Sequence, residues 1–308
     1  MSLFAVLFYY STQLSRMVFM SFNATVMADS YNHENDSRLI TLEVTFPRFI
    51  LAELNTHRVF SRNSSSSRAI PTWRLLNEVR DNPFIPDTFG SYRSGMVSGQ
   101  PLDENTSLYS KKHWLKARDQ AMYHAMHLVY GKDADDLWVG FYHDKKSLPK
   151  EVKNGAHKEL VNRILEPFMW QTAIVSSTEW DNFFHLRCAD NAQPQIRTLA
   201  EMMKESIDNS APQELYQGQW HIPFVSPEEK NTMDIYDCLL VSAGRCARIS
   251  YLNHHNDRKL SDDVKLAKRL LGDGHMSPFE HQARPCDEND IPLGNFHGWM
   301  QQRHILNS

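Results

Sequence analysis

The sequence predicts a single α/β domain with insertions. Residues 39–54 combine β-prone and apolar side chains with a break at Pro47, so we expect a strand that leads into a helix. Helical periodicity returns in four later segments, at residues 111–130, 150–167, 190–207 and 261–271. Because the sequence has no internal repeat of fixed period and no clear interdomain linker, one domain is the simplest arrangement.

The other segments complete this outline. In residues 190–207, Asp190 or Asn191 is the expected cap. The apolar face of that helix should consist of Ile196, Leu199, Ala200, Met203 and Ile207. Residues 72–79 are predicted to form a short helix. Residues 81–108 carry repeated Pro and Gly, so we expect a long irregular loop of the kind that is usually functional or disordered.

The N-terminal residues are expected to lie outside the core. Residues 1–26 are apolar and aromatic but lack a basic n-region and a small-residue cleavage site, which makes a poor signal peptide. Met20 or Met27 is then a candidate for the true start of translation. We therefore expect residues 1–26 to contribute little to the fold and residues 27–308 to form one domain.

The composition is ordinary for a soluble globular protein, with 41% hydrophobic and 23% charged residues in a chain of 308. A net charge of −4 argues against a partner that is a nucleic-acid polymer, but it leaves room for a small anionic substrate. No segment approaches the roughly 20 apolar residues of a membrane span, so no membrane partner is expected. Four cysteines without C-x-x-C spacing favour free thiols in a reducing cytoplasm.

Metal binding is not expected. His113, His124 and His127 belong to the helix predicted at residues 111–130, but no carboxylate or cysteine completes a convincing ligand set. The carboxylates in residues 133–136 lack the spacing of an EF-hand loop and are interpreted as a solvated turn. The sequence also lacks the G-x-G-x-x-G and Walker patterns, so no Rossmann dinucleotide turn is expected.

The chemically most informative segment is residues 56–68, which directly follows the apolar run at residues 46–54. It holds three arginines, one histidine, one asparagine and five serines in thirteen residues. Arginine forks and serine hydroxyls together suit the phosphates of a nucleotide or a dinucleotide cofactor. A polar loop that is simply serine-rich would have the same composition, so the spacing of the residues has to separate the two interpretations.

That spacing resembles the signature of flavin-dependent thymidylate synthases. The family reads Arg-His-Arg-x-x-Ser-x-Asn-Glu-x-Ser-x-Arg, and this chain supplies His-Arg-x-x-Ser-x-Asn-x-x-Ser-x-Arg. Residues 162–167 resemble the family's Ala-Arg-x-x-Leu-Pro, and residues 182–193 its Asn-Phe-x-x-Leu-Arg-x-x-x-x-Ala-Gln. Residues 246–251 and 274–281 resemble its Ala-Ala-Arg-Val-Ser-Tyr and Gly-His-x-Ser-Pro-x-Glu-His. Together, these matches in one chain are much stronger evidence than any one of them.

The resemblance implies a role for each matched position. The catalytic residues it implies are Arg187, Ser66 and His275. The cofactor-binding residues it implies are His57, Arg58, Asn63, Asn182, Asn191, Ser250, Ser277 and Glu280. The substrate-binding residues are Ser66, Arg68, Arg163, Arg187 and Arg303.

The chain departs from the family pattern in its order and, in the region of the arginine motif, at three positions. The Gly-His element, which the family places before the arginine motif, lies near the C-terminus, as it would after a circular permutation. Glu53 stands where the family has a substrate-binding glutamine. Thr56 replaces the first arginine of the motif, and Ser64 replaces its glutamate. These departures leave the identity of the substrate and the exact reaction open.

The C-terminal tail is a candidate for supplying part of what is missing. Residues 295–304 weakly resemble the family's Arg-Gln-Trp-x-Arg-His, so we expect Gln301 and Arg303 to contribute to the site. The alternative is an amphipathic helix that packs through apolar residues, namely Phe296, Trp299 and Met300.

Taken together, the resemblance implies an α/β fold with a twisted sheet flanked by helices, in a homotetramer with shared active sites. It implies a cytoplasmic enzyme of a prokaryotic or phage-infected cell that reductively methylates dUMP to dTMP. Methylenetetrahydrofolate would provide the carbon, and NADPH would provide reducing equivalents through FAD. Residues 81–150 would cover the site or build the oligomer. Two alternatives stay open: another modification of a pyrimidine nucleotide, such as hydroxymethylation, and a non-catalytic nucleotide-binding protein.

Overall fold

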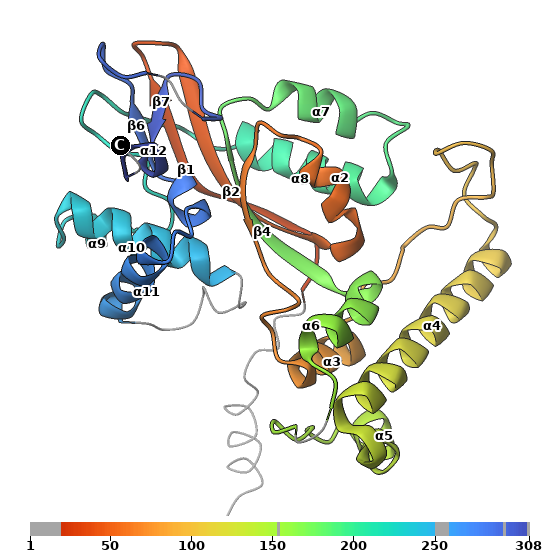
Figure 1. Ribbon diagram of the computed structural model, residues 1–308. Helices are drawn as coiled ribbons and strands as arrows, with labels where there is room; N and C mark the ends of the chain where they lie inside the picture. The colour runs from red at the N-terminus through yellow and green to blue at the C-terminus, as the bar shows by residue number, and fades with distance from the viewer. Residues whose placement is uncertain (1–19, 153–154, 250–258, 292–293, 307–308) are drawn as a thin grey trace, which may run out of the picture.

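The computed structural model describes residues 20–152, 155–249, 259–291 and 294–306. At its centre lies a five-stranded sheet in the order β3-β4-β2-β1-β5 (Figure 1). The strands are β1 (Asn23–Asn32), β2 (Ser37–Pro47), β3 (Ser61–Ser64), β4 (Trp170–Ser177) and β5 (Gln213–Glu214). All neighbours pair antiparallel except β1 and β5, which are parallel. The expected α/β architecture, a sheet flanked by helices, is confirmed.

One face of the sheet is apolar and carries the main core. From Ile40 onward, every second side chain of β2 faces this core and is at most 1% exposed: Ile40, Leu42, Val44 and Phe46. Two helices close the core, α7 (Asp181–Arg187) and α8 (Pro194–Asp208). The expected apolar face of α8 is confirmed, but neither Asp190 nor Asn191 caps the helix. Its first residue is Pro194, whose fixed φ and missing amide proton suit that position.

The other face of the sheet is polar but buried, and a row of hydrogen bonds crosses it. Ser30 Oγ lies 2.9 Å from His221 Nδ1, and His221 Nε2 lies 2.8 Å from Thr41 Oγ1. The row continues from Thr41 to Ser176 Oγ at 2.6 Å, and from there to His281 Nδ1 at 2.8 Å. Burial lowers the pKa of both imidazoles to about 3, so both are neutral near pH 7.

The C-terminal part of the chain covers this polar face (Figure 1). It contains α9 (Pro227–Lys230), α10 (Ile235–Arg248) and α11 (Leu260–Gly272), of which α11 confirms the helix predicted at residues 261–271. Next come the 3-10 helix η5 (Ser277–Glu280), the antiparallel pair β6 (Ala283–Pro285) and β7 (Trp299–Gln301), and α12 (Gln302–Leu306). The chain thereby returns to the central sheet near its end.

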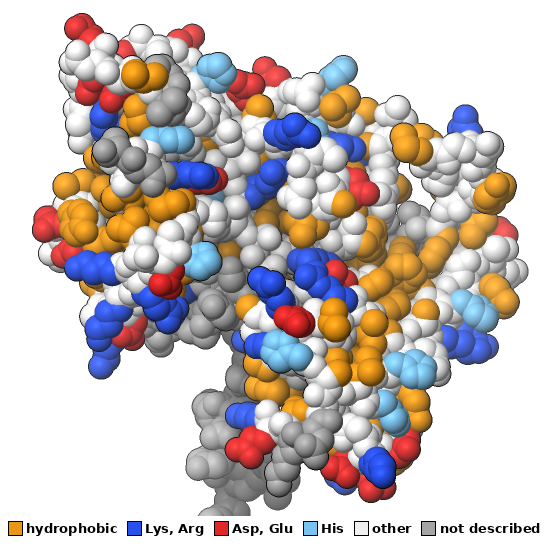
Figure 2. Space-filling model, viewed as in Figure 1, with side chains coloured by type: hydrophobic (Ala, Val, Ile, Leu, Met, Phe, Trp, Pro, Cys, Tyr) orange, Lys and Arg blue, Asp and Glu red, His pale blue; other side chains and the backbone are white. Residues whose placement is uncertain are grey.

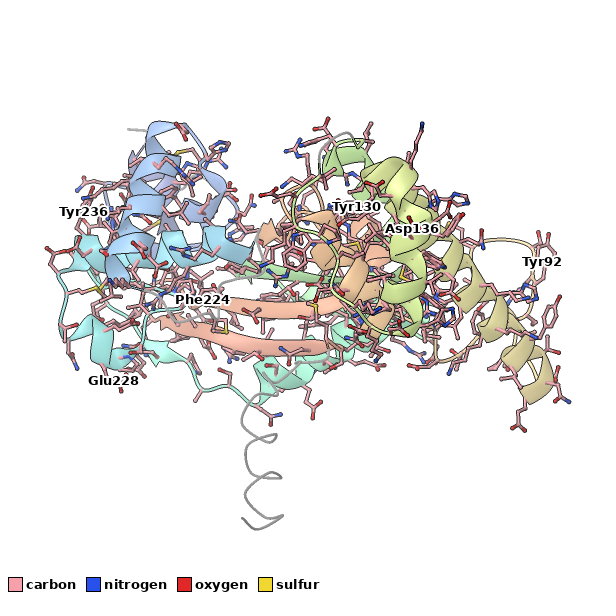
Figure 3. All side chains as sticks on the ribbon, turned by 90° about the horizontal axis from the view of Figure 1, so that it is seen from below. Tyr92, Tyr130, Asp136, Phe224, Glu228 and Tyr236 are labelled. Carbon is pink, nitrogen blue, oxygen red and sulfur yellow. The ribbon has the colours of Figure 1, made fainter. Side chains whose placement is uncertain are left out.

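A helical extension carries a second apolar cluster. It consists of α3 (Thr72–Asp81), α4 (Glu104–Tyr130), the 3-10 turn η2 (Gly131–Asp133) and α5 (Ala134–His143). The irregular loop before α4 is confirmed, but α4 begins at Glu104 and not at residue 111, because the side chain of Asp103 accepts a hydrogen bond from Thr106 N and caps it. Figure 3 shows Tyr92 of this loop at the opposite end of the molecule from Tyr236 of α10.

The structure corrects two expectations. The helix predicted at residues 150–167 is reduced to α6 (Lys158–Val161) and the 3-10 helix η3 (Asn162–Phe168), which contains a proline. Residues 23–26, expected to contribute little, begin β1, where Ala24 and Val26 pack against the main core. The part of the expected leader up to residue 19 lies outside the described residues.

Among the helices of the described ranges, none is both long and apolar enough to cross a membrane.

Candidate functional site

The motif at residues 56–68 runs from the end of a short helix, through an edge strand, to the loop before α3. The helix is α2 (Leu51–Asn55), which follows the 3-10 turn η1 (Arg48–Ile50) and confirms the predicted strand-to-helix segment. The strand is β3, in which Ser61 pairs with Ser176 of β4. This pairing fixes the backbone of the motif, so its side chains are presented from a rigid element.

At the N-terminal end of the motif, Arg187 of α7 contacts the loop after α2. Its Nε donates to His57 Nε2 at 2.9 Å, and its Nη2 donates to Thr56 Oγ1 at 3.1 Å. The His57 ring meets Phe183 edge-on, with centroids 4.9 Å apart. Burial, followed by the charges of Arg187 and Arg62, lowers the pKa of His57 to about 4. His57 is therefore neutral near pH 7, and its Nε2 accepts the hydrogen bond from Arg187.

Arg62 has a structural role in the same loop. Its Nη1 donates to the carbonyls of Leu54 at 3.1 Å and His57 at 2.9 Å, which satisfies acceptors at the C-terminal end of α2. Burial lowers the pKa of Arg62, and the charge of Glu280 opposes that shift. The carboxylate of Glu280 is thus close enough to act on Arg62 electrostatically, although η5 is remote from the motif in sequence.

The middle of the motif contacts η5 directly. With its amide oriented so that Nδ2 faces η5, Asn63 donates to Ser277 Oγ at 3.2 Å and to Ser277 O at 3.3 Å. The Asn63 side chain is buried. This contact brings together two segments that the sequence places near opposite ends of the chain, the arginine motif and the Gly-His element.

Gln301 of β7 lies beside the same contact. Its Nε2 donates to Ser61 Oγ at 3.0 Å and to the carbonyl oxygen of Glu280 at 2.8 Å. Arg303 of α12 forms an ion pair with the carboxylate of Glu280. Both tail residues that the sequence indicated therefore lie next to β3 and η5. The tail also packs through its apolar residues, but it does so as strand β7 and not as the amphipathic helix of the alternative interpretation.

At the far end of the motif, a second polar cluster forms around Glu166 of η3. Its Oε1 accepts hydrogen bonds from Ser67 Oγ at 2.7 Å and from Arg163 Nη1 at 2.8 Å. Arg48 Nη2 donates to the same oxygen at 3.2 Å. Burial lowers the pKa of Arg48, and the charge of Glu166 opposes that shift. Of these residues, the sequence indicated only Arg163 as part of the site.

The structure does not join the remaining predicted residues to these contacts. Several have exposed side chains that make no hydrogen bond with the part of the chain that the structure describes: Arg58, Arg68, Asn182, Asn191 and His275. Ser66 is half-buried, and Ser250 lies outside the described residues. Figure 2 shows the face of the molecule that is turned to the viewer in Figure 1. Lys and Arg side chains gather at its centre, where the region of α6 and η3 meets the sheet.

Ser67, Arg48 and Glu166 are residues of the second polar cluster that the sequence analysis did not assign to the site. Arg48 directly follows Pro47 at the end of β2, and a charged residue at the end of an apolar strand was the available signal. Glu166 lies in the stretch 162–167 at the position of the family's leucine. A carboxylate in place of that leucine was the available signal. Neither signal identifies a partner, because the two residues meet only through the tertiary fold.

Comparison with known proteins points to one family. Residues 36–213, more than half of the chain, match the family described as thymidylate synthase complementing protein. The matched region contains the arginine motif, the stretch 162–167 and the segment of Arg187, while η5 and the tail lie beyond it. No curated protein matches the chain.

Solved structures are similar at low identity. The UMP/dUMP methylase PolB of Streptomyces cacaoi, bound with 5-Br UMP, is 14% identical with a TM-score of 0.43, over 61% of this chain and 88% of that one. The flavin-dependent thymidylate synthase of Helicobacter pylori, complexed with FAD and dUMP, is 17% identical with a TM-score of 0.29, over 55% of this chain and 67% of that one.

Proposed function

Because the chain belongs to the thymidylate synthase complementing protein family, we propose that it is a flavin-dependent thymidylate synthase, which methylates dUMP to dTMP. The observation that carries this proposal is the contact between Asn63 and Ser277. It supports a site assembled from segments that the family orders differently, since a circular permutation moves the chain ends and keeps the packed elements together.

Arg187 is the proposed partner of the pyrimidine ring, together with Ser66. A guanidinium has five N–H groups, and Arg187 uses one on His57 and one on Thr56, which leaves others for a ligand. The two bonds orient the guanidinium before the ligand arrives. Its positive charge would stabilise negative charge that develops on the pyrimidine, an effect of about 3 kcal/mol for a well-placed donor.

The phosphate of the nucleotide is the proposed ligand of Arg68 and Arg163, with Arg303 contributing from the tail. Arginine forks match the oxygens of a phosphate. Arg68 is exposed and makes no ion pair within the described ranges, so its donors remain available. Arg163 is half exposed, with Glu166 as its present partner.

The residues present fit FAD as the resident cofactor. Arg58 supplies a cation that makes no ion pair in the described part of the chain and suits a pyrophosphate. The hydroxyl and amide groups of the other residues suit a flavin ring. The proposed cofactor-binding residues are His57, Arg58, Asn63, Asn182, Asn191, Ser250, Ser277 and Glu280. When bound, FAD supplies the redox chemistry, with NADPH as reductant and methylenetetrahydrofolate as carbon donor. His275 is exposed, which leaves it accessible to these co-substrates.

The proposed active form is a cytoplasmic homotetramer in which copies share their sites. The exposure of Asn182 and Asn191 supports this proposal, because residues at a shared site are only partly enclosed by their own chain. The extension formed by residues 81–150 is proposed to cover the site or to build the interface between copies.

A different modification of the pyrimidine, such as hydroxymethylation, is the second candidate. It is favoured by Glu53, which replaces a substrate-binding glutamine of the family. The Oε2 atom of Glu53 is buried and has no hydrogen-bond partner in the described structure. A carboxylate accepts hydrogen bonds where a glutamine both accepts and donates, so this exchange changes what the site can recognise. Ser64, in place of a glutamate, adds to the same argument.

Product analysis by mass spectrometry tests the proposal. The full chain is incubated with FAD, NADPH, methylenetetrahydrofolate and dUMP. We expect a nucleotide heavier than dUMP by one CH2 group, absent with Arg187→Ala and present with Arg269→Ala, an exposed arginine of α11. A product that also carries an extra oxygen would establish hydroxymethylation. Flavin binding without any product would indicate a non-catalytic relative.

A further inference from the structure

Glu166 occupies the position of a ligand anion within its own cluster. A single oxygen, Oε1, accepts hydrogen bonds from a hydroxyl and two guanidinium groups, which belong to Ser67, Arg163 and Arg48. Two guanidinium groups and a hydroxyl around one anionic oxygen are also the donors that proteins direct at phosphate oxygens. The carboxylate of Glu166 therefore stands where a phosphate oxygen of a ligand would find its donors.

The surroundings of the cluster are strongly cationic. Arg68 directly follows Ser67, and Lys158 Nζ donates to the carbonyl of Ala69 at 2.9 Å. With Arg48 and Arg163, this end of the motif holds four cationic side chains, and Glu166 is the acidic group that contacts two of them. A dianion is accordingly attracted to this cluster even while the carboxylate is present.

The contacts of Glu166 differ in how easily they can be exchanged. The Arg163 side chain is 50% exposed, and such a surface ion pair is weak because water screens its charges. The Arg48 side chain is only 12% exposed and is held independently, because its Nη1 also donates to Gln171 Oε1 and to Ser65 O. A competing anion can thus take Arg163 and Ser67 while Glu166 remains the counter-ion of Arg48.

We propose that Glu166 is an internal competitor at a phosphate site, and that the phosphate monoester of the nucleotide displaces it from Arg163 and Ser67. The choice of a pyrimidine nucleotide as ligand rests on the proposed function, whereas the competition itself rests on the contacts of this cluster. The family pattern has leucine at this position, so the competing carboxylate is a feature of this chain. The Glu166 carboxylate lowers the affinity of the protein for the phosphate group and leaves its affinity for the nucleoside unchanged.

The test is a calorimetric titration of the full chain and of Glu166→Gln with three probes: dUMP, deoxyuridine and inorganic phosphate. The substitution removes the charge and keeps the shape of the side chain. We expect dUMP and inorganic phosphate to bind about tenfold more tightly to the variant, which corresponds to about 1.4 kcal/mol. We expect deoxyuridine, which has no phosphate, to bind equally to both proteins.

Glu159→Gln is the matched control. Glu159 is exposed on α6, where it forms an ion pair with exposed His157, and the substitution removes the same charge from the same region. It should leave all three affinities unchanged. Glu166→Leu, which introduces the family's residue, is measured in parallel, and thermal unfolding establishes which variants are folded. Tighter phosphate binding in the folded variants supports the proposal.

Unchanged or weaker binding of dUMP and inorganic phosphate to the folded Glu166 variants would overturn the proposal and leave the proposed function intact. If no form of the protein binds dUMP, yet inorganic phosphate binds more tightly to the Glu166 variants, the substrate assignment is wrong and the competition by Glu166 stands.

Discussion

The guanidinium of Arg187 donates a hydrogen bond to the imidazole of His57 at 2.9 Å, across 130 positions of the sequence. The bond is possible only while the imidazole nitrogen is unprotonated. Burial and two neighbouring arginines ensure this by lowering the pKa of His57 to about 4. A residue of the arginine motif thereby orients a residue of the segment at 182–193, so the two act as one unit.

We predict that Arg187→Ala raises the pKa of His57 above 4, because the positive charge beside the ring is removed. The pKa should stay below 6.5, since burial, the larger cause of the shift, remains. NMR titration of the His57 ring measures this directly. Arg58→Ala, which removes an exposed arginine next to His57 in sequence, is the control and should leave the pKa unchanged. An equal pKa in wild type and Arg187→Ala would contradict the assigned contact.

The protein should lose stability as the pH falls from about 6.5 towards 3. The pKa values of His221 and His281 are lowered to about 3 in the folded state, from an ordinary value of 6.5. Between these values the unfolded chain binds protons that the folded chain does not. Each histidine then lowers the free energy of unfolding by about 1.4 kcal/mol per pH unit. Above pH 6.5 both are neutral in either state and contribute no pH dependence.

Urea unfolding at pH 7 and pH 5 checks this prediction. His281→Gln should reduce the difference between the two pH values by about 2 kcal/mol, because the proton that His281 takes up on unfolding is lost. An exposed histidine such as His185 provides the control, since His185→Gln should leave the difference as it is in wild type. A pH dependence that survives unchanged in His281→Gln would show that the buried row of hydrogen bonds is not its source.

The sequence predicted the parts of the fold that have a strong local signal. The β-prone and apolar residues of segment 39–54, such as Val44 and Phe46, predict β2, and the apolar stripe of α8 is equally clear. No local signal predicts β3, because its residues are polar and it is a strand only through pairing with β4. The same holds for the missed pair of Arg48 and Glu166, whose contact depends on η3 packing against the end of β2.

The site was predictable in composition but not in arrangement. The spacing of the motif indicated Asn63, and a separate pattern indicated Ser277, yet nothing in either pattern specifies that they touch. Gln301 is the best example of a useful weak signal, since a faint pattern in the tail indicated a residue that lies between β3 and η5. Arg58 shows the opposite case, because a strong motif position is exposed and its side chain makes no hydrogen bond or ion pair with the residues that the structure describes.

Close packing of α10 on α11 makes Gly244 sensitive to substitution. A Cβ atom at Gly244 would lie 2.4 Å from the backbone oxygen of Asp263, which cannot move easily because Arg245 and Arg248 also bind that residue. We predict that Gly244→Ala lowers the free energy of unfolding by about 1–3 kcal/mol, as overpacking does elsewhere. Urea unfolding at pH 7 measures the change.

Gly272, the last residue of α11, serves as the matched control. A Cβ atom there would meet nothing within 4 Å, so Gly272→Ala should be neutral or stabilise the protein by up to about 1 kcal/mol. If both alanine variants have the same stability, the close approach of α10 and α11 is not as described.

Gln301 should contribute to flavin affinity through the position of η5. Gln301→Ala leaves Ser61 and the carbonyl of Glu280 without their donor, at a site that is 2% exposed. An unsatisfied buried group costs about 1–3 kcal/mol. If that cost falls on the flavin-bound form, the dissociation constant for FAD should rise roughly 5- to 150-fold, measured by fluorescence quenching. Gln217→Ala, at an exposed position, should bind FAD as wild type does; equal affinities in both variants would exclude this role.

The central claim, that a nucleotide and a flavin occupy one coupled site, is tested most directly by an anaerobic visible spectrum. The full chain is mixed with FAD and NADPH, and the flavin band is followed with and without dUMP. We predict bleaching that depends on dUMP, because the reduction is expected to require both ligands on the surface formed by β3, α7 and η5. Bleaching at the same rate without dUMP, or no binding of FAD at all, would contradict the account.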